Sequence, residues 1–304
     1  MKLRLLRLSD RGTFERYLSK TRRPLAAYAF ANIAVWRRLF TVRWALVHEA
    51  LCCFFENGAG CFMYLPPLGN TGEEVLKECF RFMEEKNHNR DISRIENVAP
   101  EDLTRFGHRA LRHYKKCDEY IVRRKDMVAL AGNRFRHQRN LCNYFEKHYS
   151  ARVRAYRPGD RRAVLDLYDR WAAQKREKGR DGIYRAMLDD SRQVLADMLG
   201  SLSGLKVKAI VVACGGRPEA FSSGFFLSGP GGGFCINFEF ADLAFKGIAA
   251  YTFREFSRLC GPCEEINIMD AVGLDNIRRT KEMYHPAQTV SNYTVLLKDE
   301  ACCL

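Results

Sequence analysis

The sequence predicts an α/β chain of the α+β kind, made of two similar units, each a mixed, mainly antiparallel sheet flanked by helices. Three observations predict this fold class. Apolar segments of strand length alternate with amphipathic helical segments along the 304 residues. Glycine-rich and Asn-Gly turns join several of the strands closely enough for hairpins. The second half has the order strand, two helices, three strands, helix, strand, helix, strand, and the first half resembles it in a weaker form.

The first half begins with three expected strands joined by short turns: "VRWALVHE", "ALCCFFE" and "GCFMYLPP". A helix is expected over 71–87, because Thr71 can act as its N-cap and Glu74 completes a capping box. The strand "DISRIENV", a helix over 100–115 and the strand "EYIVRR" follow. This half is therefore expected to form its own sheet with helices against it.

The second half gives clearer signals. Its expected strands are "ARVRAYRP", "LKVKAIVVAC", "EAFSSGFFLS", "GFCINFEF", "EINIM" and "TVSNYTVLL". Its expected helices cover 160–178, 184–200, 247–260 and 274–283. Three of these strands follow one another through glycine turns, which predicts an antiparallel meander.

Residues 133–149 are expected to form a helix that is basic on its outer side and apolar on its inner side. The inward residues are Phe135, Leu141, Cys142 and Phe145. The predicted organisation is therefore an N-terminal unit over 1–131, a basic connecting helix over 132–150 and a C-terminal unit over 151–304.

Positive charge is concentrated near the middle of the sequence. Residues 105–162 contain 17 Lys and Arg against 5 Asp and Glu, which accounts for most of the formal net charge of +14. Such a segment attracts polyanions through counterion release, and arginine forms forked contacts with phosphates. We therefore expect tRNA or another polyanion to bind through 105–162, with an anionic membrane surface as an alternative.

The composition excludes several classes of protein. Apolar residues make up 47% and charged residues 28%, as in ordinary globular proteins. There is no apolar stretch of transmembrane length and no signal-peptide pattern at the start, so a cytoplasmic location is expected.

The twelve cysteines do not follow a zinc-binding spacing, and we expect no metal site. The single Cys-x-x-Cys motif, Cys260-Gly-Pro-Cys263, follows an expected helix, whereas a redox cysteine normally begins one. The motif is therefore interpreted as a turn with two incidental cysteines.

Four stretches resemble the DUF2156 family, whose relatives include the C-terminal domains of phosphatidylglycerol lysyltransferases. They are "YAFANIAVW", "GNRFRHQRNLCNYF", "FEFADLAFKG" and "NIMDAVGLDNIRRTKEMYHP". The family residues that match are Gly132, Arg139, Asn140, Phe145, Glu239, Ala241, Asp242, Asn267, Asp270, Gly273, Arg278, Lys281, Tyr284 and Pro286. Gln138, Phe240, Ile268, Met269 and Ala271 depart from the family pattern.

The resemblance implies a tandem GNAT fold and transfer of an aminoacyl group from aminoacyl-tRNA to an acceptor hydroxyl. The donor is then a substrate, and no cofactor is required. The acceptor is a lipid or a small molecule, either as a hydroxyl or as an amine. At 268, 269 and 271, apolar or small residues replace polar family residues. The alternative that the protein binds RNA but has lost transfer activity therefore stays open.

The catalytic candidates are acids at strand ends in the second unit: Glu239, Asp242 and Asp270. Such a carboxylate could bind the α-amine of the donor or act as a base. Alternatively, Asp242 and Asp270 cap a loop or helix. The substrate-binding candidates are Arg134, Arg136, Arg139, Asn140, Lys246, Asn267, Arg278 and Lys281.

An acetyl-CoA-dependent N-acetyltransferase is the alternative enzyme. Those enzymes hold the pyrophosphate with (Arg or Gln)-x-x-Gly-x-(Gly or Ala) at a helix start. The sequence here has Gly247 and Ala249 of that motif, but Ala244 replaces its leading residue. Lys246 could supply a charge in its place.

Overall fold

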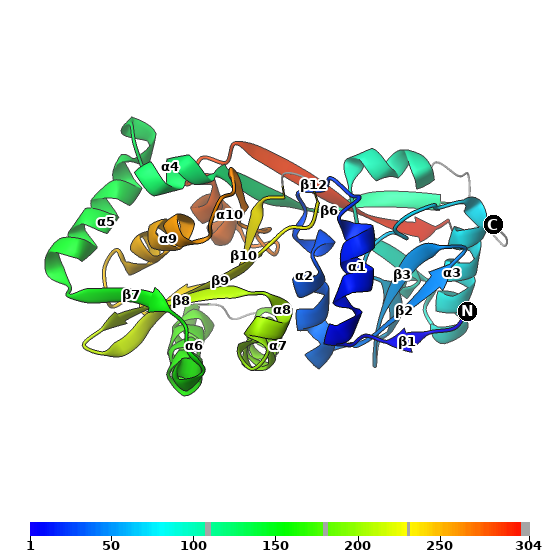
Figure 1. Cartoon of the computed structure of the whole chain (residues 1–304), viewed down its shortest axis with the longest axis horizontal. Coiled ribbons are helices and arrows are strands. Elements are labelled where there is room, and N and C mark those ends of the chain that lie inside the picture. Colours follow the sequence, from blue (N-terminus) through cyan, green and yellow to red (C-terminus); the bar gives the residue numbers. More distant parts are fainter. Residues whose placement is uncertain (107–110, 179–181, 230–231, 299–304) are drawn as a thin grey trace.

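A computed structural model describes residues 1–106, 111–178, 182–229 and 232–298. Twelve strands form one sheet in the order β1-β2-β3-β4-β5-β12-β6-β11-β10-β9-β8-β7 (Figure 1). The strands are β1 (Arg4–Leu5), β2 (Thr41–Val47), β3 (Ala50–Asn57), β4 (Gly60–Met63), β5 (Arg94–Val98), β6 (Leu111–Arg123), β7 (Ala151–Ala155), β8 (Lys208–Cys214), β9 (Arg217–Phe226), β10 (Phe234–Ala241), β11 (Glu265–Asn267) and β12 (Gln288–Leu297).

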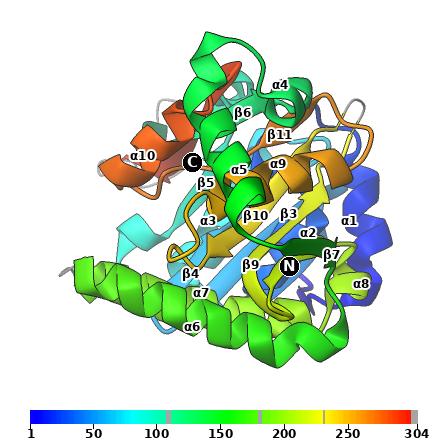
Figure 2. The ribbon, with the colours of Figure 1, turned by 90° about the vertical axis from the view of Figure 1, so that its left-hand side faces the viewer.

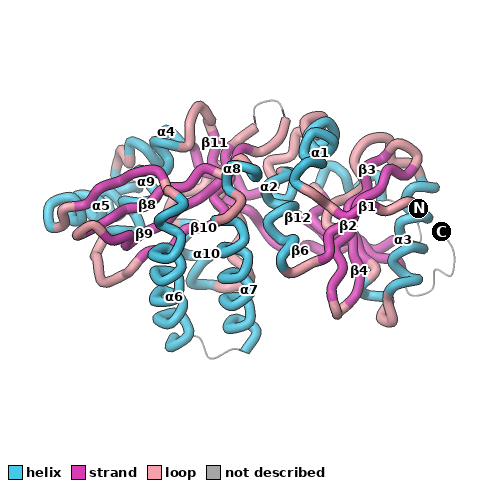
Figure 3. The backbone as a smooth tube through the Cα atoms, turned by 60° about the horizontal axis from the view of Figure 1, so that its bottom comes forward, coloured by secondary structure: helices cyan, strands magenta, loops and turns pink. Residues whose placement is uncertain are grey.

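Helices cover both faces of this sheet. They are α1 (Arg11–Leu18), α2 (Phe30–Val35), α3 (Glu73–Lys86), α4 (Arg124–Ala129), α5 (Arg136–His148), α6 (Arg161–Lys178), α7 (Gly182–Leu199), α8 (Leu202–Leu205), α9 (Ile248–Leu259) and α10 (Asp275–Glu282). In the second half, α6 and α7 lie side by side on one face, and α9 with α5 covers the other (Figures 2 and 3). None of the helices in the described ranges is long and apolar enough to span a membrane.

The two halves of the chain exchange their last strands. β6 ends the first half in sequence, but it pairs with β11 and β12 of the second half. β12 ends the second half and pairs with β5 of the first. The sheet is therefore continuous across the middle of the molecule (Figure 1). The division of the chain into 1–131, 132–150 and 151–304 stays a prediction.

The expected α/β fold class is confirmed, and the elements of the second half lie within a few residues of their expected positions. The expected helix over 100–115 is wrong. Pro100–Phe106 forms 3-10 helix, and Leu111–Arg123 is the long strand β6. Its exposed, basic residues hide the strand pattern, and the strand forms because β12 pairs with it along almost its full length.

The capping box expected at 71–74 is also absent. α3 begins after Gly72, which makes no side-chain capping hydrogen bond. Glu73 and Glu74 in the first turn still stabilise the helix start, because their negative charge complements the helix dipole.

The basic helix α5 lies within the second half of the molecule. It packs on α9, at the end of the molecule far from α1 and α2 (Figure 1). Phe135, Cys142 and Phe145 are buried in this contact as expected, and Leu141 is half-buried. Close approach is possible because Gly247, with φ +89°, lies directly under the Leu141 carbonyl group.

Candidate functional site

A pocket of about 450 Å³ opens where two parallel strands separate. β10 and β11 pair only through Phe234–Ile266 and Cys235–Asn267. Beyond these pairs, β10 continues along β9, while the chain after Asn267 follows β6. The Ile268 N–H donates to the Tyr120 carbonyl group, and the Tyr120 N–H donates to the Met269 carbonyl group. The sheet therefore splits here, and side chains from both edges of the gap line the pocket.

Both halves of the chain contribute to this pocket. Asn32, Val35 and Trp36 come from the first half, in and just after α2. The other lining residues belong to the second half: Trp171, Ser191, Val194, Ile236, Asn237, Phe238, Glu239, Phe253, Ile268, Met269, Asp270, Val272, Ile277, Thr280, Lys281 and Tyr284. The lining is mainly apolar and aromatic with a few charged groups, as in many small-molecule sites.

Three of the predicted site residues meet in the pocket: Glu239, Asp270 and Lys281. The Glu239 carboxylate accepts a hydrogen bond of 3.3 Å from the Ser222 hydroxyl. Burial raises the pKa of Glu239 to about 8, although Ser222 and Lys281 act in the opposite direction. A carboxyl group with this pKa can exchange a proton near neutral pH.

Lys281 lies on the opposite wall of the pocket, on α10. Burial lowers the pKa of Lys281, and the charges of Asp270 and Glu239 oppose this shift. Its ammonium group donates a hydrogen bond to the Ile268 carbonyl group. Asp270 also accepts a hydrogen bond from the Val272 N–H at 3.2 Å, so it supports the turn before α10 while lining the pocket.

Asp242 lies outside the residues that line this pocket. One carboxylate oxygen accepts a hydrogen bond of 3.0 Å from the Ala244 N–H, and the other is 3.6 Å from Arg170 Nε. These contacts are those of a loop cap before α9. The catalytic role proposed for Asp242 stays a prediction, and Asp242 is not among the residues that line the pocket.

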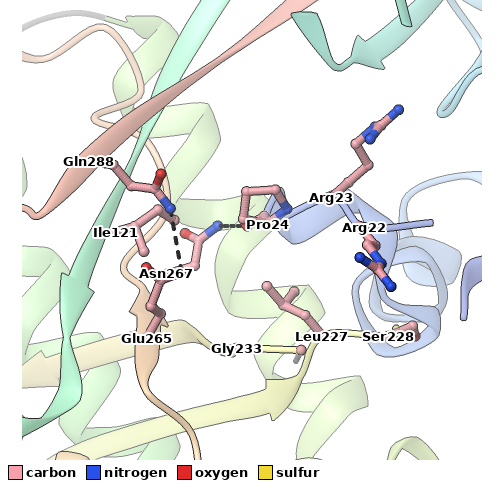
Figure 4. A pocket seen from close by; sticks show the side chains of 11 residues that line it. Arg22, Arg23, Pro24, Ile121, Leu227, Ser228, Gly233, Glu265, Asn267 and Gln288 are labelled. Carbon is pink, nitrogen blue, oxygen red and sulfur yellow. Dashed lines mark hydrogen bonds between the residues drawn. The ribbon is translucent and has the colours of Figure 1, made fainter. Parts of the chain in front are cut away.

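Asn267 holds the two halves together below the pocket. Its Nδ2 donates to the Pro24 carbonyl group at 2.7 Å and to the Glu119 carboxylate at 2.5 Å. Figure 4 shows the Asn267 amide directed toward Pro24 in a second cavity, of about 220 Å³. Glu119 also accepts from the Ala26 N–H at 2.8 Å. Asn267 therefore has a structural role in the described contacts.

Glu119 is a buried acid that sequence reasoning missed. Burial raises its pKa to about 7, against the hydrogen bonds from Asn267 and Ala26. The sequence places Glu119 in the expected strand "EYIVRR", but it does not indicate which face of that strand is buried. The burial of Glu119 could therefore not be predicted.

Apart from Lys281, the basic candidates do not line the pocket. Arg134 pairs with Asp126 at 2.8 Å, and Arg139 donates to the carbonyl groups of Leu130 and Gly132 at the end of α4. Arg136 and Asn140 are exposed on α5. The two remaining candidates have local partners: Lys246 lies 4.6 Å from the centre of the Tyr144 ring, and Arg278 pairs with Asp275 at 2.9 Å.

The aromatic walls of the pocket were not predicted as site residues. Trp36, Trp171 and Phe238 come from three separate elements, and only the tertiary fold brings them together. Tyr284 was recognised as a family match, without a role.

Comparisons with known proteins give the family and the fold. The family model "Phosphatidylglycerol lysyltransferase, C-terminal" matches residues 21–296. A conserved protein of unknown function from Bacteroides thetaiotaomicron is similar in structure, with TM-score 0.86, 22% identity, and 98% of this chain and 100% of that chain covered.

Two further structures show the same fold. L-PGS from Bacillus licheniformis has TM-score 0.62 and 18% identity over 95% of this chain and 91% of its own. FemX has TM-score 0.60 and 8% identity, and the match covers 99% of this chain and 98% of the FemX chain. A search of curated proteins finds no match.

Proposed function

The chain belongs to the phosphatidylglycerol lysyltransferase C-terminal family, and from this membership we propose that it moves an aminoacyl group from tRNA to an acceptor in the pocket between β10 and β11. The observation that carries the proposal is the meeting of Glu239, Asp270 and Lys281 in one aromatic-lined pocket at the split of the sheet. The acceptor is a hydroxyl or an amine.

The chemistry starts from an ester that is already activated. Ionised Glu239 takes the proton from the acceptor as its oxygen or nitrogen attacks the ester carbonyl group. The Lys281 ammonium group stabilises the negative charge that develops on the carbonyl oxygen. The bond to the tRNA hydroxyl then breaks, and that hydroxyl receives the proton from Glu239. Asp270 holds the α-amine of the donor.

The acetyl-CoA alternative is weaker, because α5 covers the start of α9. A pyrophosphate would have to approach the backbone N–H groups at that helix start. The Leu141 carbonyl group and the Phe145 side chain pack against Gly247 there, and Lys246 lies over the Tyr144 ring. Both observations favour a tRNA-borne donor.

The direct test supplies the full chain with a pool of charged tRNA and, separately, with acetyl-CoA, and follows the loss of the acyl group from its carrier. Thr280→Trp would place an indole at the rim of the pocket from an exposed position on α10. We expect it to lower kcat/KM with charged tRNA by about tenfold or more. Arg279→Trp, on the neighbouring exposed position outside the pocket, is the control. Equal rates for Thr280→Trp and Arg279→Trp would contradict a reaction in this pocket.

The basic surface of α5 is proposed to bind the phosphates of the tRNA. Arg136→Glu changes an exposed charge on this helix, and we expect weaker RNA binding with a salt dependence shallower by roughly one unit of log–log slope. Arg185→Glu makes the same change on the exposed side of α7. Fluorescence anisotropy with tRNA at several salt concentrations measures both variants. If Arg185→Glu weakens binding as much as Arg136→Glu, the effect is one of net charge alone.

A further inference from the structure

The turn between α9 and β11 brings two thiol groups together. Cys260 Sγ and Cys263 Sγ lie 3.7 Å apart. Gly261 has φ +105°, a conformation that glycine adopts readily, and its carbonyl group accepts the Cys263 N–H at 2.9 Å. The turn therefore folds back on itself and holds the two sulfurs in contact. The sequence-based interpretation of two incidental cysteines did not anticipate this contact.

Two cations flank the thiol pair. Lys208 Nζ donates to the Cys260 carbonyl group at 3.1 Å. Arg124 donates to the carbonyl groups of Ser257 and Arg258, in the last turn of α9, at 2.8 and 3.1 Å. The hydrogen bond with Cys263 lowers the pKa of Cys260 to about 7, and Arg124 and Lys208 act in the same direction against the effect of burial. Such surroundings favour a thiolate.

The two sulfurs differ in access. Both thiols are buried, but Cys263 keeps 9% of its surface exposed, whereas Cys260 keeps none. We propose that Cys260 and Cys263 form a redox-active dithiol site that exchanges with low-molecular-weight disulfides of the glutathione type and closes into an intramolecular disulfide. This site is separate from the pocket and does not depend on the proposed transfer reaction.

The exchange has two steps. The hydrogen bond to Cys260 raises the pKa of Cys263, so the Cys263 thiol passes its proton to the Cys260 thiolate as its sulfur attacks one sulfur of glutathione disulfide and releases one glutathione thiolate. That glutathione thiolate takes the proton from Cys260. The Cys260 thiolate then attacks the Cys263 sulfur of the mixed disulfide and releases the second glutathione thiolate. The protein loses two thiol protons and two electrons, and one glutathione disulfide becomes two glutathione thiols.

The position of the site connects it to the pocket. The disulfide would join the end of α9, whose Phe253 lines the pocket, to the loop that leads into β11. β11 pairs with β10 just before the sheet splits. Oxidation would thus restrict the movement of β11 relative to α9, next to the point where β10 and β11 separate to form the pocket.

The test uses the full wild-type chain equilibrated with glutathione disulfide, alkylated and digested with trypsin. Both thiols fall in the tryptic peptide 259–278, which contains no other cysteine. We expect this peptide to lose both alkylation sites and to weigh two hydrogens less. Cys52 and Cys79 are an internal control, because their sulfurs are 3.5 Å apart but both are fully buried in an apolar cluster. That pair should stay fully alkylated when the protein is denatured in alkylating agent.

Variants separate the two steps. Cys260→Ser should accumulate glutathione on Cys263, because no second thiol resolves the mixed disulfide. Cys263→Ser should resist glutathione, because Cys260 has no access to solvent. Two alkyl groups on peptide 259–278 of the oxidised wild-type chain would overturn the proposal, and so would oxidation of Cys52 and Cys79 at the same rate.

Discussion

Replacing Glu239 with Gln is expected to lower kcat for aminoacyl transfer by about a hundredfold to ten-thousandfold, the usual effect of removing a general base. Gln has nearly the same shape but cannot accept the proton of the acceptor. Affinity for tRNA should not change, because the basic surface of α5 is untouched. The matched control is Glu219→Gln, which alters another buried glutamate on the neighbouring strand, paired with Arg170 at 2.7 Å outside the pocket.

The pH dependence of the same variant gives a second measurement. Wild-type kcat should rise with pH through about 8, as Glu239 ionises, and Glu239→Gln should lack this rise. If kcat and its pH profile survive the substitution, Glu239 is not the base. If the wild-type chain binds tRNA but shows no turnover, an RNA-binding relative without activity becomes the better interpretation.

The stability of the Glu239 variant should change in the opposite direction to its activity. Burial raises the folded-state pKa from its ordinary value of 4.5 to about 8, so the folded protein holds this proton more tightly than the unfolded chain. Wild-type stability therefore falls as pH rises across this interval. Glu239→Gln avoids the loss and should be more stable above pH 8, by up to about 5 kcal/mol, with no gain near pH 4.5.

Replacing Gly247 with Ala is expected to lower the free energy of unfolding by on the order of 3 kcal/mol. The new Cβ would collide with the Leu141 carbonyl group and lie 3.2 Å from Phe145 Cβ. The φ of +89° adds backbone strain for any residue with a Cβ. Because α5 and α9 pack through this glycine, both helices would have to shift.

Gly216→Ala separates the collision from the strain. Gly216, in the turn between β8 and β9, has a similar φ of +82° but nothing within 4 Å of its Cβ position, so its substitution should cost only about 1 kcal/mol. Urea denaturation of both variants measures the difference. Equal losses would show that α5 does not press against the start of α9.

Local signals were enough to predict most of the second half. α9 was expected over 247–260 and spans Ile248–Leu259, because its amphipathic period and the glycine before it are both visible in the sequence. β6 was mistaken for a helix in part, since the residues of β12 that pair with it lie 167 to 186 residues further along the chain. Pairing at that distance leaves no trace in a local pattern.

The candidate site was predicted through the family resemblance more than through residue chemistry. Glu239, Asp270 and Lys281 all match the family stretches, and the structure brings them into one pocket. The charge pattern correctly placed a basic, amphipathic helix near 133–149. It could not show that α5 would pack on α9, because the complementary surface is formed by Gly247 and its neighbours in another part of the chain.

The exchange of β6 and β12 makes the protein indivisible. A fragment starting at residue 151 would carry β11 without β6 beside it, and β12 would have no neighbour on either side. Strands that lie at the centre of the intact sheet would then become edge strands with unpaired backbone N–H and C=O groups in both halves. Melting should consequently proceed as a single cooperative event, with no temperature at which one half is folded and the other is not.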